Sequence, residues 1–406
     1  MKSLLVSLIS DQTIPNVQLI KEFPETTDYL FITTIGMERK GVRRWIINTS
    51  NIENSKEIIV DEFSFEDIIN KLSENDFEIY DKIYVNITGG TKIMTLAAYE
   101  FFKEAGVQGI YYITGKENEY VKLFPKTKNK HNHLLSKVSI DDYLHAYGFN
   151  VKKSNKCNIS FDQTTRVFNL FCKRDMYKDF SDEYKYLFSK RGKAIKGDAL
   201  KVIAPLLNEF EFVSEKHDCL SEEEVKYLTG DWFEEYIGNR IKSELHLEDS
   251  QLLIGAEIFK EISPLSKNDV TILLNMTDSK LDKSVNEIDV MFIYKNQFYS
   301  IECKTSIIDI KSVPNNKGEM IEKEVNILGE TLYKSDSLKN KFGLFAKTTI
   351  MTMTSFESYI NDKDISKKNN KTRQMEEFIG RANLSNIKLV DKSMLNSETS
   401  LYSLIK

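Results

Sequence analysis

The chain has 406 residues, of which 41% are hydrophobic and 29% are charged, and its formal net charge is −5. This length exceeds one ordinary hydrophobic core and suits two or three domains. The composition excludes a largely disordered chain. The weakly acidic balance argues against coating nucleic acid by bulk attraction, while leaving a local basic channel open.

Cysteine usage and the N-terminus bear on the compartment. Four cysteines and five histidines show no zinc-type spacing, and a chain of this length does not depend on a disulfide framework. The opening "MKSLLVSLIS" has a short apolar run followed by "DQTIPN", which predicts a first buried strand and not a signal peptide. No apolar run approaches the roughly 20 residues of a membrane helix. We therefore expect a cytoplasmic protein without membrane contact.

Strands and helices alternate through about the first 125 residues. Apolar runs bounded by turn residues predict strands at 4–9, 29–34, 57–60, 82–88 and 109–114, and an edge strand at 120–124. Helical spacing of apolar residues predicts helices at 14–23, 37–47, 65–72 and 92–103. The alternation indicates βαβ units and a mostly parallel α/β sheet, whose ligands bind beyond the carboxyl ends of the strands.

Strand signals fade between about 126 and 225, where charge rises and the pattern is mainly helical. The cations from Lys185 to Lys201 fit either the solvated face of a connector or contact with nucleic acid. We expect an N-terminal domain at 1–145, a mainly helical connector at 146–225 and a C-terminal α/β domain at 226–406.

The C-terminal part has its own pattern of elements. It predicts helices at 230–245, 322–338 and 374–385, strands at 252–262, 269–276 and 386–392, and a segment at 341–353 that begins with a strand. Between them, a hairpin is predicted at 286–306 with its turn at 295–297.

The first motif is "TGGTK", from Thr88 to Lys92, at the change from strand to helix. Adjacent glycines permit positive φ and remove the Cβ atoms that would block a ligand. Free N–H groups at the start of a helix favour anions. Thr91 is suited to cap the helix and to donate to a phosphate, and Lys92 adds a point charge. The motif is neither a Walker A loop nor a GxGxxG fingerprint, and a tight turn without a ligand is the alternative.

A second polar loop, "SDQTIPN" at Ser10–Asn16, follows the first strand. Loops after the first and fourth strands of a doubly wound sheet converge, and together these two suit a sugar–phosphate chain. The arrangement resembles the CARF domain, the Rossmann-like sensor of type III CRISPR defence, over roughly residues 1–145. The resemblance implies a pocket for cyclic oligoadenylate lined by Ser10, Gln12, Thr13, Thr88, Gly89, Gly90, Thr91, Lys92 and Thr114.

The second motif is "IECKTS", in which Glu302 and Lys304 are two residues apart on a predicted strand and so share a face. Asp289 lies on the preceding strand. Two carboxylates beside a lysine form a hard-oxygen site that suits Mg²⁺ or Mn²⁺. Such an ion polarises a phosphodiester and activates water, while the lysine stabilises developing charge. The alternative is a surface hairpin with incidental charges.

The spacing D-x12-E-x-K resembles the core of PD-(D/E)xK nucleases, with Ile288 where the proline of the motif name would stand. Glu234, in "GDWFEEYIG", lies on or beside the helix face of Ile237. By this resemblance Glu234 supports the metal on a preceding helix. The predicted catalytic residues are Glu234, Asp289, Glu302 and Lys304, the first three being the predicted metal ligands.

A CARF-like sensor joined to such a nuclease resembles the Can2/Card1 group of CRISPR ancillary nucleases. The resemblance implies a homodimer that binds one cyclic tetra-adenylate across its two sensor domains and then cuts DNA, RNA or both with Mn²⁺ or Mg²⁺. Two alternatives stay open. One is a restriction- or repair-type endonuclease without a cyclic activator, and the other is a non-cleaving sensor that signals through partners.

Overall fold

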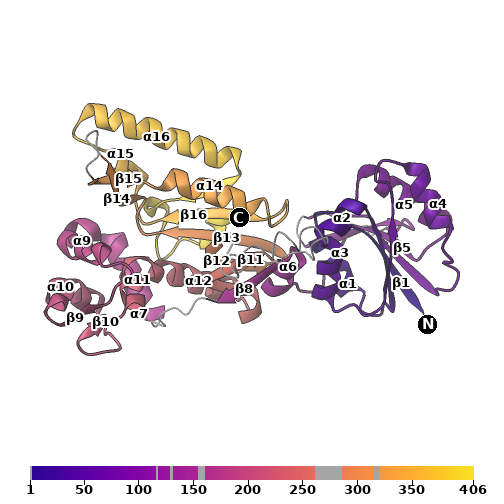
Figure 1. Cartoon of the computed structure of the whole chain (residues 1–406), viewed down its shortest axis with the longest axis horizontal. Helices are drawn as coiled ribbons and strands as arrows, with labels where there is room; N and C mark the ends of the chain where they lie inside the picture. The colour runs from indigo at the N-terminus through magenta and orange to yellow at the C-terminus, as the bar shows by residue number, and fades with distance from the viewer. Residues whose placement is uncertain (1, 116–117, 129–130, 154–160, 261–285, 315–319) are drawn as a thin grey trace, which may run out of the picture.

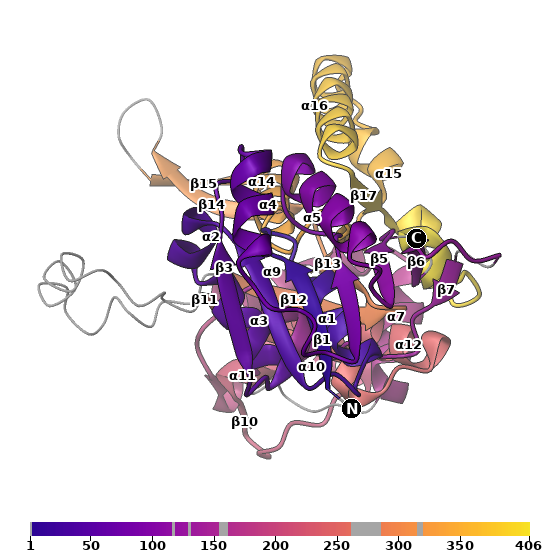
Figure 2. The same cartoon turned by 90° about the vertical axis from the view of Figure 1, so that its right-hand side faces the viewer.

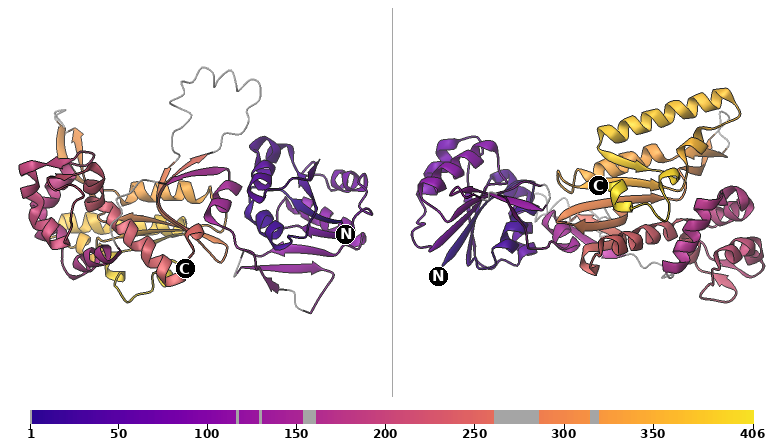
Figure 3. Two further views of the ribbon diagram at one scale, coloured as in Figure 1. Left: turned by 90° about the horizontal axis from the view of Figure 1, so that it is seen from below. Right: turned by 180° about the vertical axis from the view of Figure 1, so that it is seen from behind.

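The computed structural model describes residues 2–115, 118–128, 131–153, 161–260, 286–314 and 320–406. Two α/β domains lie end to end along the long axis, and the chain crosses between them through α6 (Ile140–Ala146) and β8 (Phe149–Lys153) (Figures 1 and 3). The strand expected at 269–276 lies outside the described residues. Within the described residues, no helix is both long and apolar enough to span a bilayer.

The N-terminal domain is built on a seven-stranded sheet with the order β3-β2-β1-β4-β5-β6-β7. Its strands are β1 (Ser3–Leu8), β2 (Asp28–Thr33), β3 (Ser55–Ile59), β4 (Lys82–Asn86), β5 (Gly109–Ile113), β6 (Glu119–Phe124) and β7 (His131–His133). Strands β1 to β5 are parallel, which confirms the predicted architecture and brings the ends of β1 and β4 together. The strand predicted at 120–124 is β6, but the prediction that it is an edge strand is wrong, because the polar segment "HNH" pairs with it as β7 and forms that edge.

Alternating side chains decide which helices cover each face of this sheet. Leu4, Val6 and Leu8 pack with α4 and α5, whereas Leu5 packs with α1 and α3, on the side facing the second domain (Figure 1). Figure 2 views the molecule from the opposite, α4–α5 side. The helices are α1 (Ile14–Glu22), α2 (Ile35–Lys40), α3 (Val42–Ser50), α4 (Phe65–Ser73) and α5 (Lys92–Glu104). The single helix predicted at 37–47 is wrong, since Gly41 has φ 80° and separates two helices.

The second domain has a six-stranded sheet with the order β17-β16-β13-β12-β11-β8. The strands other than β8 are β11 (Leu252–Lys260), β12 (Asn286–Tyr294), β13 (Gln297–Lys304), β16 (Lys347–Thr352) and β17 (Ile387–Val390). The predicted hairpin is confirmed as β12–β13, with Lys295 and Asn296 at positive φ in its turn. Strands β13, β16 and β17 are parallel, whereas β8, β11, β12 and β13 are antiparallel neighbours.

A separate two-stranded arm projects from this domain, formed by β14 (Ile308–Pro314) and β15 (Met320–Asn326). The helix predicted at 322–338 is therefore wrong at its start, because 322–326 pair with β14 instead. Helix α14 (Leu328–Lys339) begins only after the arm. The remaining C-terminal helices are α15 (Phe356–Ile360), α16 (Ile365–Leu384), the 3₁₀ turn Lys392–Met394 and α17 (Leu401–Ile405).

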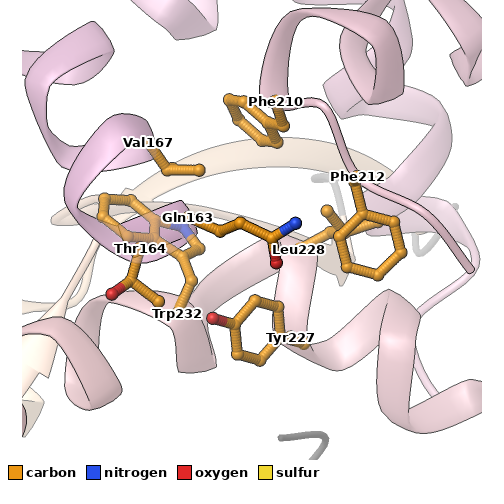
Figure 4. A pocket seen from close by; sticks show the side chains of 8 residues that line it. All are labelled: Gln163, Thr164, Val167, Phe210, Phe212, Tyr227, Leu228 and Trp232. Atoms are coloured by element: carbon orange, nitrogen blue, oxygen red, sulfur yellow. The ribbon is translucent and has the colours of Figure 1, made fainter. Parts of the chain in front are cut away.

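Residues 146–225, expected as a connector, contribute both a strand and helices to the second domain. Strand β8 pairs with β11, and Phe168 of α7 packs in one core with Trp232 and Phe292. Figure 4 shows an apolar cavity left within this helical layer. The elements are α7 (Phe161–Lys173), α8 (Met176–Asp179), α9 (Ser181–Ser189), β9 (Ile195–Lys196), the 3₁₀ turn Gly197–Ala199, α10 (Leu200–Phe210), β10 (Cys219–Leu220), α11 (Glu222–Lys226), the π turn Tyr227–Asp231, α12 (Trp232–Leu245) and the 3₁₀ turn Asp249–Gln251.

A single hydrophobic core crosses the junction between the domains. It joins residues of α1 and α3 to α6, β8 and one face of the second sheet. The Tyr143 ring stacks on Phe298 with centroids 5.0 Å apart, and Phe149 lies 5.3 Å from Phe342. The domains are therefore joined by continuous packing and not by a loose tether.

Candidate active site and sensor loops

Asp289 and Glu302 lie beside each other where the pairing between β12 and β13 ends, while β12 stays paired with β11 and β13 with β16. The antiparallel register pairs Val290 with Ile301, so the next residues outward are the two carboxylates. Asp289 and Glu302 are each only 6% exposed. Ile301 and Cys303, which alternate with Glu302, point into the core on the other face, as the strand spacing predicts.

Two lysines approach the buried Glu302. Lys304 Nζ lies 2.8 Å from Glu302 Oε1 and 3.5 Å from Asp289 Oδ2. Lys334, which projects from α14, places its Nζ 3.3 Å from the same Glu302 oxygen. Asp289 Oδ2 also accepts a 2.7 Å hydrogen bond from the backbone N–H of Cys303. Sequence reasoning identified three of these residues but missed Lys334, which lies 32 residues from Glu302 in the chain.

Burial and neighbouring charge shift the titration of this cluster. Burial, and then the negative charge of Asp289, raise the pKa of Glu302, while Lys304 and Lys334 oppose that rise. Burial alone would lower the pKa of Lys304, but the carboxylates of Asp289, Glu302 and Glu234 raise it well above its ordinary value. Lys304 is therefore held as a cation between carboxylates.

Glu234 is buried on α12 and lines the same cleft as Asp289, Glu302 and Lys304. Its helix packs through Phe233 and Ile237 against the second sheet, which turns Glu234 towards the strand ends. A π turn at Tyr227–Asp231 precedes α12 and brings the buried Asp231 to the cleft as well. Asp231 was not predicted from the sequence. Such π turns recur at functional sites.

The donor chemistry of the cleft fits a divalent cation. In the described ranges, no three His, Cys, Asp or Glu side chains are already gathered as a metal cluster. However, Glu234, Asp289 and Glu302 line one cleft with buried carboxylates, and carboxylate oxygens are the ligands that Mg²⁺ and Mn²⁺ prefer. Burial raises the pKa of Glu302, and two lysines contact its carboxylate. Nearby positive charge therefore stabilises the ionised form of these carboxylates.

The cleft has a basic wall that comes from the expected connector. Arg191 and Ile308, the first residue of β14, both line the cleft. The Arg191 guanidinium lies 5.3 Å from the Phe188 ring, and its Nε donates to Thr229 Oγ1 at 3.3 Å. Thus one cation of the basic stretch from Lys185 to Lys201 lines the same cleft as the carboxylates.

The local structure alone requires glycine at both positions of "TGGTK". A Cβ atom on Gly89 would collide with the carbonyl oxygen of Leu8, and Gly90 has φ 76°. Thr91 caps α5, because its hydroxyl accepts from the N–H of Met94. The strand-to-helix turn and its threonine cap agree with prediction, while Lys92 at the helix start is exposed. Both the turn and the exposed cation are compatible with a ligand.

The other predicted sensor residues differ in their hydrogen bonds and in their burial. Ser10 Oγ accepts from the N–H of Gln12, and Thr88 Oγ1 accepts from the N–H of Ile113. Thr114 is half-buried after β5. Thr13 is only 1% exposed, so in this conformation its side chain faces the interior and not a pocket.

A buried pair of asparagines joins the first turn of α1 to the end of β4. Asn86 Nδ2 donates to Asn16 Oδ1 at 2.7 Å, and Asn16 Nδ2 donates to the carbonyl oxygen of Leu8 at 3.2 Å. Asn86 Oδ1 also accepts from the N–H of Thr88. Sequence reasoning missed this link, although a polar residue at the end of an otherwise apolar strand was a usable signal.

The amino-acid sequence matches two family models in chain order. They are the Card1 CARF domain, over residues 4–143, and the Card1-like endonuclease domain, over residues 221–396. No curated protein matches the chain.

Solved structures share the fold at low sequence identity. Can2 from Sulfobacillus thermosulfidooxidans, in complex with cyclic tetra-adenylate, has 18% identity and a TM-score of 0.67, over 100% of this chain and 99% of that one. Protein VC1899 from Vibrio cholerae has 16% identity and a TM-score of 0.66, over 96% and 94%. A type III CRISPR defence DNA nuclease activated by cyclic oligoadenylate has 12% identity and a TM-score of 0.52, over 87% of this chain but 45% of that one.

Proposed function

Because the chain belongs to the Can2/Card1 group of CARF-domain endonucleases, we propose that it is a nuclease switched on by a cyclic oligoadenylate. The observation that carries the catalytic half of this proposal is the cluster of Asp289, Glu302 and Lys304 in one cleft. The sensor half is supported by the converging loops after β1 and β4.

Glu234, Asp289 and Glu302 are the residues that would hold Mn²⁺ or Mg²⁺ in the cleft. When bound, such an ion polarises the phosphodiester and lowers the pKa of a water molecule. The protein contributes orientation, since the Cys303 N–H fixes the carboxylate of Asp289. Lys304, kept charged by its neighbours, is suited to stabilise negative charge on the phosphate as the bond breaks.

We propose nucleic acid as the substrate, with DNA, RNA or both open to cleavage. The similar type III CRISPR defence protein is a DNA nuclease, and the same ion chemistry serves either backbone. Arg191 and the start of β14 both line the cleft, which supports an entry path between the helical layer and the β14–β15 arm. A guanidinium is well suited to contact phosphate there.

Cyclic tetra-adenylate is the activator we propose, because it is the ligand in the complex of the similar Can2. Lys92 and the N-terminus of α5 would meet its phosphates. A homodimer is proposed as well, because exposed apolar side chains follow the carboxyl ends of the strands near these loops. They are Ile35, Phe63 and Leu96. A second copy would cover them and complete the pocket.

The proposal is tested by measuring cleavage of single- and double-stranded DNA and RNA with Mn²⁺ or Mg²⁺, with and without cyclic tetra-adenylate. Cutting that depends on the activator supports it. Cutting without the activator favours a restriction- or repair-type enzyme, and the absence of cutting with every cyclic oligoadenylate favours a non-cleaving sensor. Lys304→Ala should abolish cutting while direct binding of cyclic tetra-adenylate is kept.

A further inference from the structure

Lys334 contacts Glu302, although the active site predicted from the sequence does not include it. Its Nζ lies 3.3 Å from Glu302 Oε1, the oxygen that Lys304 also contacts at 2.8 Å. The Glu302 side chain is 7% exposed and that of Lys334 is 36% exposed. A buried carboxylate responds strongly to the loss of one cationic neighbour, so Lys334 is able to fix where Glu302 points.

Helix α14, which carries Lys334, connects two different cores. Leu328 and Leu332, towards its start, pack with Ile307 and Ile350 behind the active site. Leu338, in its last turn, belongs to the core that crosses the domain junction. Because a helix of 12 residues moves as a nearly rigid rod, a displacement at its end is passed to Lys334.

The loop after α14, residues 340–346, is fastened to the sensor side of the junction. The N–H of Leu344 donates to Gln12 Oε1 at 3.0 Å. The Tyr143 hydroxyl donates to the carbonyl oxygen of Phe342 at 2.7 Å. Gln12 lies in the loop after β1, which is one of the two proposed activator loops. The end of α14 is therefore held by a residue at the place where the activator would bind.

We propose that Lys334 is a positioning residue for Glu302 and that the sensor sets this position through α14 and the Gln12–Leu344 hydrogen bond. The inference rests on the proposed function, since it requires an activator at the sensor and cleavage in the cleft. An activator that alters the contact between Gln12 and Leu344 shifts the end of α14. The shift is driven only by the difference between the activator's affinities for the protein with α14 in its original and in its shifted position.

The first test compares Lys334→Met with Lys334→Arg. The loss of a charged contact should lower kcat at saturating cyclic tetra-adenylate by about tenfold or more. Arginine keeps the charge and should restore most of the rate. The thermal midpoint should match the wild type in both variants, because Lys334 is partly exposed and Glu302 keeps its contact with Lys304.

The second test uses the position that Gln12 holds. Leu344→Pro removes the N–H that donates to Gln12, whereas Leu344→Ala keeps it and trims a side chain that is 77% exposed. Leu344→Pro should lower the activated rate, and Leu344→Ala should not. If both contacts act through one path, Leu344→Pro should add little in the Lys334→Met background. Should the proline variant misfold, Tyr143→Phe loosens the same loop and is tested in the same cycle.

The outcomes separate the inference from the proposed function. A wild-type protein that cuts nothing with any cyclic oligoadenylate overturns both. A wild type that cuts, with Lys334→Met cutting equally fast, overturns the inference alone. The inference is also overturned if Lys334→Met and Lys334→Arg lose the same activity and both have a lowered thermal midpoint. It is overturned as well if the rate losses of Lys334→Met and Leu344→Pro multiply in the double variant.

Discussion

Asp289 Oδ2 accepts a 2.7 Å hydrogen bond from the backbone N–H of Cys303, on the strand that carries Glu302 and Lys304. The bond ties Asp289 to the backbone between Glu302 and Lys304. Because the donor is a backbone N–H, the distance of Asp289 from Glu302 and Lys304 depends on the geometry of β13 and not on a second flexible side chain.

This bond separates the structural role of Asp289 from its charge. The amide oxygen of an Asp289→Asn variant still accepts from the Cys303 N–H, so the fold should persist. The missing negative charge should lower cleavage by about a hundredfold or more, because the proposed ion loses a ligand. Cleavage rate, thermal midpoint and binding of cyclic tetra-adenylate check the prediction. An Asn variant that cuts at the wild-type rate would remove Asp289 from the proposed site.

The acid limb of the pH–rate profile should reflect Glu302. Burial and Asp289 raise its pKa above the ordinary 4.5, so the neutral form persists to a higher pH than for an exposed glutamate. At a metal concentration that does not saturate the site, cleavage should fall as the pH drops through that raised pKa, because a proton then competes with the ion for the carboxylate. Lys334→Met removes a charge that lowers the pKa, and should move the limb to still higher pH. Lys185→Met, a charge loss at an exposed site on α9 that does not line the cleft, is the control and should leave the limb in place.

Arg191 should contribute to substrate binding and not to chemistry. Arg191→Ala should raise KM, and it should flatten the dependence of log affinity on log salt by roughly 0.7–0.9 if one phosphate contact is lost. Lys185→Ala removes the same charge from an exposed site on α9, away from the residues that line the cleft, and serves as the matched control. Equal effects of the two substitutions would argue that only net charge matters.

Gly89 should tolerate no side chain. Gly89→Ala places a Cβ against the carbonyl oxygen of Leu8, and overpacking of this kind costs about 1–3 kcal/mol. We expect a lower free energy of unfolding and a weaker response to cyclic tetra-adenylate. Gly36→Ala, where the new atom meets only an ordinary contact at 3.7 Å, should be close to neutral. Chemical denaturation and an activator titration of both variants decide the point.

Lys92 should act on activator affinity alone. Lys92→Ala removes one charge-assisted phosphate contact, which should raise the activator concentration needed for half-maximal cleavage by about tenfold. Saturating cyclic tetra-adenylate should largely restore the maximal rate. Titration of cleavage against activator measures this, and a variant that titrates like the wild type would exclude Lys92 from the pocket.

Local pattern was sufficient for much of the fold and for part of the site. The alternation of strands and helices predicted the sheet around β1, and the two-residue spacing put Glu302 and Lys304 together because strand geometry is periodic. Met320–Asn326 misled prediction, since its glutamates and lysine favour a helix while its pairing partner β14 is decided by tertiary structure.

Residues that reach the site from elsewhere in the chain could not be predicted. Lys334 lies in α14 and Arg191 lies just after α9, and both are ordinary charged residues that their sequence neighbours do not mark. Their roles arise from where α14 and the end of α9 pack, which depends on contacts distant in sequence. The burial of Thr13 was hidden for the same reason, because a polar loop does not reveal which of its side chains turns inward.

The pairing of β8 with β11 affects whether a truncated chain could act as an unregulated nuclease. The strand that leaves the sensor completes the edge of the sheet in which β12 carries Asp289 and β13 carries Glu302. If a protease cut the chain after β8, that strand would stay paired in the nuclease sheet. If the whole N-terminal part including β8 were lost, β11 would become an unpaired edge strand and the core at the domain junction would be exposed to water. Accidental truncation should therefore unfold the nuclease before it releases an unregulated one, so that control and competence are lost together.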